Sequence, residues 1–473
     1  MKILMVASEA APFAKTGGLA DVVGSLPAAL KSLGHEVAVL LPRYRSVELK
    51  TARRIYDSLA VWLGPDNFDT GVYLIQQETP FYFLDCPPLY DRPGLYGEEG
   101  VDYPDNHVRF AVLARAALEF SRHIFRPDIL HCHDWQAGLA PVYLRTIYAN
   151  DPTFLGIRTL FTVHNLGYHG LFPAAAMDAI GLGDAGLFRP DGLEFFGKIG
   201  YLKGGLSFSD ALNTVSPTYA REIQTPEYGF ALDGVLRARA NVLTGILNGV
   251  DYTEWNPQTD PFIAARYSTA DLSGKRICKG DLVHEFGLPA EARDAPLIGI
   301  VSRFTSQKGA DLIAEIADDM VAEGFYMVAL GTGEPHYEAL FHAMAARHPG
   351  RISVRIGYDN ALAHKIEAGA DLFLMPSRYE PCGLNQIYSL KYGTVPLVRA
   401  TGGLDDTIDS ETGFKFGPYS GSALLERLRA ARQAFGDQEG WRAMMLAGMA
   451  KDYSWKASAA GYARLYGRLG RRD

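Results

Sequence analysis

The stretch KILMVASEAAPFAKTGGLADVVGSLPAALKSLGHEVAVLLP, residues 2–42, decides the fold. Its first segment, 2–9, and its last, 36–42, have the apolar pattern of buried strands. Between them apolar residues recur at helical spacing until Gly34, which ends the helix. This order opens a parallel α/β sheet, and such sheets bind ligands where their strands end. The glycine pair of KTGGLADV (15–22) lies at such an end.

Length and composition limit the class of protein. A chain of 473 residues exceeds one ordinary core, so we expect two or three domains. The net charge of −8 argues against a nucleic-acid or anionic-membrane partner, since both require a basic surface. No apolar run has the length of a membrane span or a secretory signal, so we expect a cytoplasmic protein. The four cysteines form no C-x-x-C pair, which indicates reduced thiols.

The strand and helix pattern occurs twice along the chain. In the first half we expect further strands at 128–134, 158–165 and 210–216, with helices at 106–123 and 135–148. The pattern restarts at 296–304 and continues with a helix at 309–324, a strand at 325–331, a helix at 336–348, and strands at 352–358, 371–377 and 394–400. We therefore predict an α/β protein of two doubly wound units with parallel sheets, joined near 241–257.

A second glycine loop, TGGLDDT (401–407), follows the last of these strands. SRFTSQKG (302–309) follows the first strand of the second half and places Arg303 and Lys308 before a helix. Cations beside a helix N-terminus suit a diphosphate. The alternative is a pair of solvated surface cations. Two glycine loops at the ends of two sheets predict one ligand held in a cleft.

Polar residues follow other predicted strands. Glu380 in SRYEPCGLNQ (377–386) could bind sugar hydroxyls or oppose developing positive charge, or it could only cap a helix. His131 and His133 in HCHDW (131–135) share a strand face, and two histidines alone are thin support for a metal. His164 ends a strand and could bind a hydroxyl, or it could be a core histidine.

The segment 89–110 is a long polar loop rich in tyrosine. Tyr90, Tyr96 and Tyr103 could stack on sugar faces. Equally, they could only pin the loop.

Six ordered motifs, KTGGLADV, HCHDW, FTVHN, SRFTSQKG, SRYEPCGLNQIYSLKYGT and TGGLDDT, resemble those of bacterial glycogen synthases and plant starch synthases, from residue 1 to about 465. The resemblance implies two Rossmann-like domains facing across a deep cleft, 1–245 and 246–455, with a helix at 456–473 packing back on the first. It implies transfer of glucose from ADP-glucose to the non-reducing 4-hydroxyl of an α-1,4-glucan such as glycogen, with retained configuration and without metal or cofactor.

The resemblance also implies roles for single residues. The expected catalytic residues are Lys15 at the donor phosphates and glucose, His164 at the donor sugar, Arg303 and Lys308 at the leaving diphosphate, and Glu380 at the sugar hydroxyls. The expected substrate-binding residues are Gly17, Gly18, Asp21, Asp134, Asn165, Asn248, Cys382, Gly383, Leu384, Thr401, Gly402, Gly403 and Leu404.

Two positions depart from the family pattern. Related glycosyltransferases often carry a second Glu eight residues after the first, where this chain has Tyr388, which argues against a two-carboxylate mechanism. Asn385 stands where bacterial relatives are expected to have Thr.

We expect the diphosphate itself to accept the acceptor's proton. We also expect Lys308→Ala and Arg303→Ala to lower turnover with little change in melting temperature.

Other functions stay open at this point. A dinucleotide-dependent oxidoreductase would use similar sheets, but no G-x-G-x-x-G follows the first strand. A glucan-binding scaffold with a dead site is opposed by the joint presence of Lys15, Arg303, Lys308 and Glu380. A phosphorylase would need a lysine-bound pyridoxal cofactor. UDP-glucose is an alternative donor, and the motifs carry no information on oligomeric state.

Overall fold

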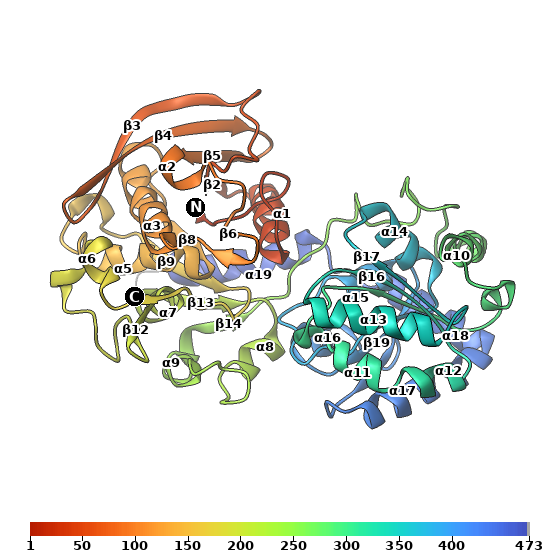
Figure 1. Cartoon of the computed structure of the whole chain (residues 1–473). Helices are drawn as coiled ribbons and strands as arrows, with labels where there is room; N and C mark the ends of the chain where they lie inside the picture. The colour runs from red at the N-terminus through yellow and green to blue at the C-terminus, as the bar shows by residue number, and fades with distance from the viewer. Residues whose placement is uncertain (471–473) are drawn as a thin grey trace. The chain divides into compact units, whose positions relative to one another are not determined.

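The computed structural model describes residues 1–470, which form two compact units (Figure 1). Unit 1 contains residues 1–215, 220–249 and the segment from Trp455, and unit 2 contains residues 216–219 and 250–454. Helix α8 (Pro217–Glu222) spans one change of unit. The chain thus changes unit at 249/250 and at 454/455, beside the expected boundaries at 245 and 455. Residues 471–473 of the expected last helix lie outside the described residues.

Unit 1 is built on a sheet in which β1 lies between β2 and β8, parallel to both. Because the chain leaves β1 toward β2 on one side and later returns to β8 on the other, the carboxyl ends of β1 and β8 form a topological switch point. As described within residues 1–470, this sheet has nine strands in the order β14 (Leu243–Gly245), β13 (Ala211–Thr214), β9 (Arg158–Val163), β8 (Ile129–His133), β1 (Lys2–Val6), β2 (Glu36–Pro42), β5 (Pro80–Asp85), β4 (Asp66–Gln76) and β3 (Arg53–Leu63).

The expectation of a wholly parallel sheet in unit 1 is wrong at one edge. β3 pairs antiparallel with β4, and β4 pairs antiparallel with β5. In β3 the side chains of Leu59, Val61 and Leu63 are buried while their neighbours are exposed. This alternation is typical of an antiparallel edge with one solvated face, whereas parallel strands read as continuous apolar runs.

The helices of unit 1 follow the strands. The expected helix at 135–148 divides at Gly138 into two shorter helices, and a Cβ at this position would lie 2.1 Å from the carbonyl oxygen of Tyr201. The last helix bonds to the body of the unit, since the Ser458 hydroxyl donates to the Leu247 carbonyl over 2.6 Å. The helices are α1 (Gly18–Ser32), α2 (Pro87–Tyr90), α3 (Asn106–His123), α4 (Asp134–Ala137), α5 (Leu139–Arg145), α6 (Ala176–Ala179), α7 (Tyr201–Phe208), α9 (Asp233–Ala238) and α19 (Trp455–Gly470).

Two small antiparallel sheets complete unit 1. Their strands are β10 (Leu171–Pro173), β12 (Lys198–Gly200) and β11 (Glu194–Phe195) in one, and β6 (Gly97–Glu98) and β7 (Val101–Asp102) in the other.

Unit 2 has a parallel sheet whose order places its first strand, β15, beside its fourth, β18. This is the Rossmann order 3-2-1-4-5-6, with its switch point between β15 and β18. Side chains of Ile298, Met327 and Leu372 are fully buried in its core. The strands in order are β17 (Ile352–Ile356), β16 (Tyr326–Gly331), β15 (Leu297–Val301), β18 (Leu372–Met375), β19 (Val395–Arg399) and β20 (Phe414–Phe416).

Helices connect these strands, and the expected helix at 309–324 divides at Ile316. The helices of unit 2 are α10 (Ser273–Glu285), α11 (Ala310–Glu315), α12 (Ala317–Ala322), α13 (Pro335–Arg347), α14 (Asn360–Gly369), α15 (Asn385–Lys391), α16 (Gly402–Thr407), α17 (Gly421–Gly436) and α18 (Gln438–Met449). No helix within residues 1–470 combines the length and the apolar character needed to cross a membrane.

Arg109, which is fully buried in α3, holds the tyrosine-rich loop of unit 1. Its guanidinium donates to the carbonyls of Leu89 at 2.7 Å and Leu95 at 3.0 Å. The Tyr90 hydroxyl in turn donates to the Arg109 carbonyl at 2.7 Å. Tyr103 accepts from the Gly94 amide at 3.1 Å. These contacts favour the pinning interpretation of the loop's tyrosines.

Replacing Arg109 by Met should lower the free energy of unfolding of unit 1 by about 3 kcal/mol, because the buried Leu89 carbonyl and the partly buried Leu95 carbonyl lose a charged donor. Urea unfolding monitored by circular dichroism measures the loss. Arg126→Met is the matched control, since Arg126 also donates to two carbonyls but is exposed, so water replaces its bonds. Equal losses in both variants would contradict this account of the loop.

Candidate active site

Glu9 organises the loop that follows β1 in unit 1. This residue is buried, and its carboxylate accepts bonds from the Thr16 amide at 2.5 Å and the Thr16 hydroxyl at 2.6 Å. The Tyr96 hydroxyl donates to the same carboxylate at 2.5 Å. The sequence interpretation missed Glu9, although a carboxylate just past a buried strand was an available signal. Glu9 therefore fixes the backbone next to Lys15.

Gly17 and Gly18 begin helix α1, and neither glycine is required by the fold. Gly17 has a φ of −161°, which any residue adopts, and a Cβ at either position would meet no atom within 4 Å. Within residues 1–470 their amides donate to no acceptor. The two glycines therefore leave room and free N–H groups for a ligand at a helix N-terminus. Beside them, Lys15 pairs with Asp21 at 2.6 Å, and the lysine side chain is half exposed.

Asp134 joins the ends of β8 and β9. Its φ is +54°, and its carboxylate accepts the His164 amide at 2.7 Å. It also accepts from the Asn165 backbone, and loss of hydration outweighs both bonds, which raises the pKa of Asp134 to about 7. The Asn165 side chain accepts from the Gly167 amide at 2.9 Å. Asp134 and Asn165 thus shape the loop that carries His164.

His164 lies among buried histidines. Its Nε2 is 3.0 Å from Nδ1 of His133, and burial lowers the pKa of His164 to about 3. A neutral imidazole at this place fits the sequence expectation. His131 is a core histidine, since its ring nitrogens bond to Tyr466 at 2.8 Å and Thr162 at 2.7 Å. Within residues 1–470 no three His, Cys, Asp or Glu side chains are arranged to hold a metal ion.

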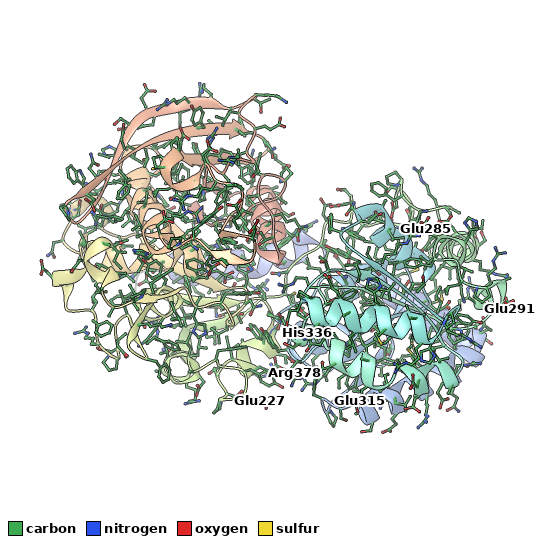
Figure 2. The ribbon with its side chains drawn as sticks, in the orientation of Figure 1. Glu227, Glu285, Glu291, Glu315, His336 and Arg378 are labelled. Carbon is green, nitrogen blue, oxygen red and sulfur yellow. The ribbon has the colours of Figure 1, made fainter. Side chains whose placement is uncertain are left out.

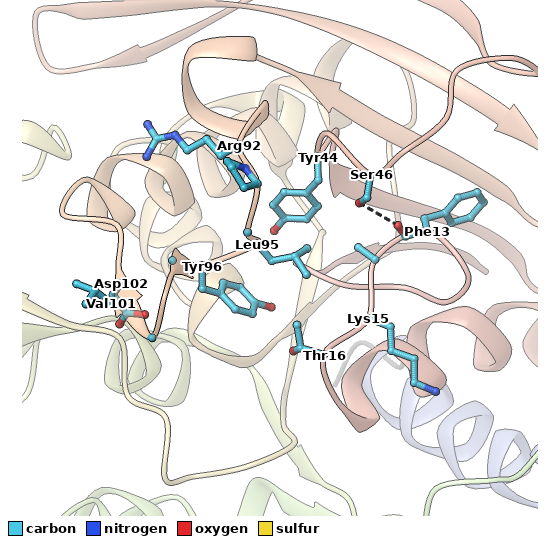
Figure 3. Close-up of a pocket in the computed structure, with 15 residues that line it drawn as sticks. Phe13, Lys15, Thr16, Tyr44, Ser46, Arg92, Leu95, Tyr96, Val101 and Asp102 are labelled. Carbon is cyan, nitrogen blue, oxygen red and sulfur yellow. Dashed lines mark hydrogen bonds between the residues drawn. The ribbon is translucent and has the colours of Figure 1, made fainter. Parts of the chain in front are cut away.

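A hollow of about 570 Å³ adjoins the Lys15 loop (Figure 3). Lys15 and Thr16 line one side, and the segment from Arg92 to Asp102 lines the other. The ring of Tyr96, which Glu9 holds, also lines it. Elsewhere in unit 1, Asn248 is buried, and its Oδ1 has no partner among residues 1–470.

Lys308 and Glu380 meet at the switch point of unit 2. Lys308 follows β15, Glu380 follows β18, and Nζ lies 2.5 Å from Oε2. The Ser377 hydroxyl donates to the same oxygen at 3.1 Å. Glu380 is only 4 % exposed. Glu380 is therefore the buried partner of a catalytic candidate, and the capping interpretation is not needed.

The TGG loop packs closely on the loop that carries Glu380. Gly402 has a φ of +46°, and a Cβ there would lie 1.8 Å from the Glu380 carbonyl oxygen. A Cβ on Gly403 would lie 2.1 Å from the Cys382 carbonyl oxygen. The expected phosphate donors Gly403 and Leu404 already donate their amides, to Glu380 and to Thr401. Both glycines are thus needed by the fold of unit 2.

The remaining predicted residues of unit 2 lie in these same loops. Cys382 is buried and its carbonyl accepts from the Gln386 side chain at 3.0 Å. Gly383 has a φ of +73°, and Leu384 directly precedes α15. Thr401, fully buried, precedes α16.

Arg303 lies just past β15 and is exposed, so its side chain is accessible to a ligand. Arg378, labelled in Figure 2, lies past β18 and pairs with Asp311 at 3.1 Å. Tyr358, which the sequence interpretation did not single out, lies two residues past β17 and is 85 % exposed. An exposed aromatic face near a strand end is suited to stacking on a nucleotide base.

The structure explains both departures from the family pattern. Asn385 donates from its side chain to the Val301 carbonyl at 2.7 Å, which ties the start of α15 to the end of β15. Tyr388 stacks on Trp255 with ring centroids 4.0 Å apart, and Trp255 stacks on His364 at 3.8 Å. An aromatic stack therefore occupies the position of the second carboxylate.

Comparisons with known proteins cover both units. Residues 2–238 match the family "Starch synthase catalytic domain", and residues 288–433 match "Glycosyl transferases group 1". The chain is 50% identical to the "Glycogen synthase" of Koribacter versatilis over 98% of each chain. It is also 50% identical to that of Anaeromyxobacter dehalogenans strain 2CP-C, over 98% of this chain and 99% of the relative.

A solved structure gives the same result. The catalytic domain of starch synthase IV from Arabidopsis thaliana, bound to ADP and acarbose, matches with a TM-score of 0.90, 33% identity and 99% of each chain covered. The described fold and these matches agree. The chain belongs to the glycogen and starch synthase family of glycosyltransferases.

Proposed function

We propose that this chain is a glycogen synthase that transfers glucose from ADP-glucose to the non-reducing end of an α-1,4-glucan with retention of configuration. The observation that carries the proposal is the Lys308–Glu380 pair at the switch point of unit 2, where this fold binds its ligand. The near full-length likeness to glycogen synthases supports the glucan, and the ADP in the starch synthase structure supports the donor. We further propose a cytoplasmic location, because nucleotide sugars are intracellular metabolites.

Charge development sets the roles of the unit 2 residues. Glucosyl transfer builds positive charge at the anomeric carbon and negative charge on the departing diphosphate. Lys308 and Arg303 stabilise the diphosphate, and Glu380 faces the sugar while it holds Lys308. Because Tyr388 replaces a second carboxylate, we propose same-face displacement, in which the diphosphate accepts the acceptor's proton.

Residues of unit 1 and further loop residues of unit 2 supply the remaining groups of the proposal. The amides of Gly17 and Gly18 and the ammonium of Lys15 bind the donor's phosphates and glucose. Neutral His164 donates or accepts a hydrogen bond at a sugar hydroxyl. Asp21, Asp134, Asn165 and Asn248 serve the sugar and acceptor side, and Cys382, Gly383, Leu384, Thr401, Gly402, Gly403 and Leu404 line the donor side of unit 2. No metal or cofactor has a role in this scheme.

The direct test is incorporation of radiolabelled glucose into glycogen from ADP-glucose and, separately, from UDP-glucose. We expect faster incorporation from ADP-glucose. Faster incorporation from UDP-glucose would show that UDP-glucose is the preferred donor. No incorporation from either nucleotide sugar would support an inactive glucan-binding scaffold.

Arg303→Ala should lower kcat on the order of 10²–10³-fold with an unchanged melting temperature, because Arg303 is exposed and acts on charge in the transition state. Lys308→Ala should lower kcat similarly but also lower the melting temperature, since it leaves buried Glu380 without its cation. This replaces the sequence-based expectation of unchanged stability for both. Arg347→Ala, at an exposed ion pair at the far end of α13, is the control. Near-normal turnover in both variants would remove these cations from the mechanism.

Tyr358→Ala should raise the KM for ADP-glucose on the order of 2- to 10-fold with little change in kcat, because stacking on the base contributes equally to ground and transition states. Tyr358→Phe should keep the wild-type KM. Steady-state kinetics on one glucan primer measures both. An unchanged KM in Tyr358→Ala would show that the base binds elsewhere.

Asp134 predicts a pH dependence of stability. Its folded pKa of about 7 lies above the ordinary value of 3.8, so the folded state binds the proton more tightly. The stabilisation is fully present below about pH 4 and is lost progressively as the pH rises to about 7, above which stability no longer changes. The melting temperature of the wild type should therefore fall relative to that of Asp134→Asn between pH 5 and about 7 and then stay level with respect to it up to pH 9.

The control for Asp134 is Asp151→Asn. Arg122 holds the pKa of Asp151 at about 2. The difference in melting temperature between the wild type and Asp151→Asn should therefore stay constant between pH 5 and 9. Parallel melting curves for the wild type and Asp134→Asn would contradict the raised pKa.

A further inference from the structure

An exposed group of aromatic rings lies on unit 1 outside the residues assigned above. We call it the aromatic patch and define it as Tyr168, His169, Phe195, Phe196 and Phe230. Phe196 is 80 % exposed, Tyr168 54 % and Phe230 37 %. The ring of Phe195 lies 4.9 Å from that of Phe196 and 5.0 Å from that of His169. Exposed apolar groups gathered in this way mark interaction sites in soluble proteins.

Phe196 has an unfavourable backbone conformation and an exposed side chain. It forms the two-residue turn between β11 and β12 with Gly197, and both residues have positive φ, +49° and +78°. This is the pattern of a type I′ turn, which favours Asn-Gly, and a bulky residue with positive φ is an outlier. The side chain also gains nothing from burial. Neither the backbone nor the core of unit 1 accounts for a phenylalanine at this turn.

The patch continues directly from the proposed site. Tyr168 follows Asn165 after only two intervening residues, so the two lie at most about 11 Å apart. His169 extends the chain into the patch, with its ring 6.4 Å from that of Phe230. A polymer whose end is held at Asn165 must run over neighbouring surface, and this surface adjoins that residue.

The chemistry of the patch suits a neutral sugar chain. Each pyranose ring has an apolar face of C–H groups and an edge of hydroxyls. Exposed aromatic rings offer flat apolar partners, while His169 and the exposed Lys198 of β12 offer polar groups at the margin. β12 is labelled in Figure 1.

We propose that the aromatic patch binds an α-1,4-glucan chain of the acceptor beyond the residues that enter the reaction. This inference rests on the proposed function, since it deepens the same enzyme's recognition of its polymer. Phe196 is the central contact, and its role is retention of long acceptors, with no part in the chemical step.

The variant Phe196→Asn separates binding from folding. It restores the favoured Asn-Gly turn, so its melting temperature should equal or exceed that of the wild type. Its KM for glycogen should rise on the order of 2- to 10-fold. Its kcat and its KM for ADP-glucose should remain those of the wild type, because the patch takes no part in the chemical step or in donor binding.

Two further variants serve as controls. Phe196→Tyr keeps an aromatic face and should keep the wild-type KM for glycogen. Trp62→Asn removes an aromatic side chain that is 51 % exposed on edge strand β3, and it should leave the KM for glycogen unchanged.

The outcomes distinguish the patch from the activity. If the wild type synthesises glucan and Phe196→Asn has an unchanged KM for glycogen, glucan binding by the aromatic patch is overturned and the proposed function stands. No synthesis by the wild type would overturn the proposed function itself. A concentration-dependent mass in sedimentation that Phe196→Asn abolishes, with unchanged glycogen binding, would make the patch an interface between two copies of the chain and would also overturn the inference.

Discussion

The ion pair of Lys308 and Glu380 is the interaction on which the active-site geometry of unit 2 depends. The two residues come from loops that leave adjacent strands, β15 and β18, at the point where the strand order reverses. At 2.5 Å the pair joins the two loops at this point and gives the nearly buried Glu380 side chain a cationic partner. The backbone carbonyl of Glu380 also accepts a hydrogen bond from the Gly403 amide. The loops that follow β15, β18 and β19 are therefore fixed together.

In unit 1 the loop that carries a lysine is held by a different interaction. Glu9 is also a buried carboxylate just past the first strand of its sheet, but its partners are the amide and hydroxyl of Thr16. Lys15 therefore stays half exposed and pairs only with Asp21 at the surface. In each unit a buried acid shapes the loop that carries a lysine. The lysine of unit 2 is held, whereas the lysine of unit 1 projects from a held backbone.

Sequence periodicity was sufficient for the two doubly wound units, because buried parallel strands are continuous apolar runs. It failed at β3 and β4, whose half-exposed alternation was not recognised, and at the helices that divide at Gly138 and Ile316. The family resemblance, which the comparisons confirm, named the strand-end residues, but it carried no information on their partners. Neither pattern nor motif could show that Glu380 pairs with Lys308, that Leu404 already donates its amide, or that Tyr388 lies in an aromatic stack.

The central claim is that Lys308 and Arg303 bind the diphosphate at the switch point of unit 2. A crystal structure of the wild type soaked with ADP tests it most directly. The account predicts the β-phosphate within hydrogen-bond distance of Lys308 Nζ and Arg303, with Lys308 shared between the phosphate and Glu380. Well-defined ADP elsewhere, with Lys308 bonded to Glu380 alone, would contradict it.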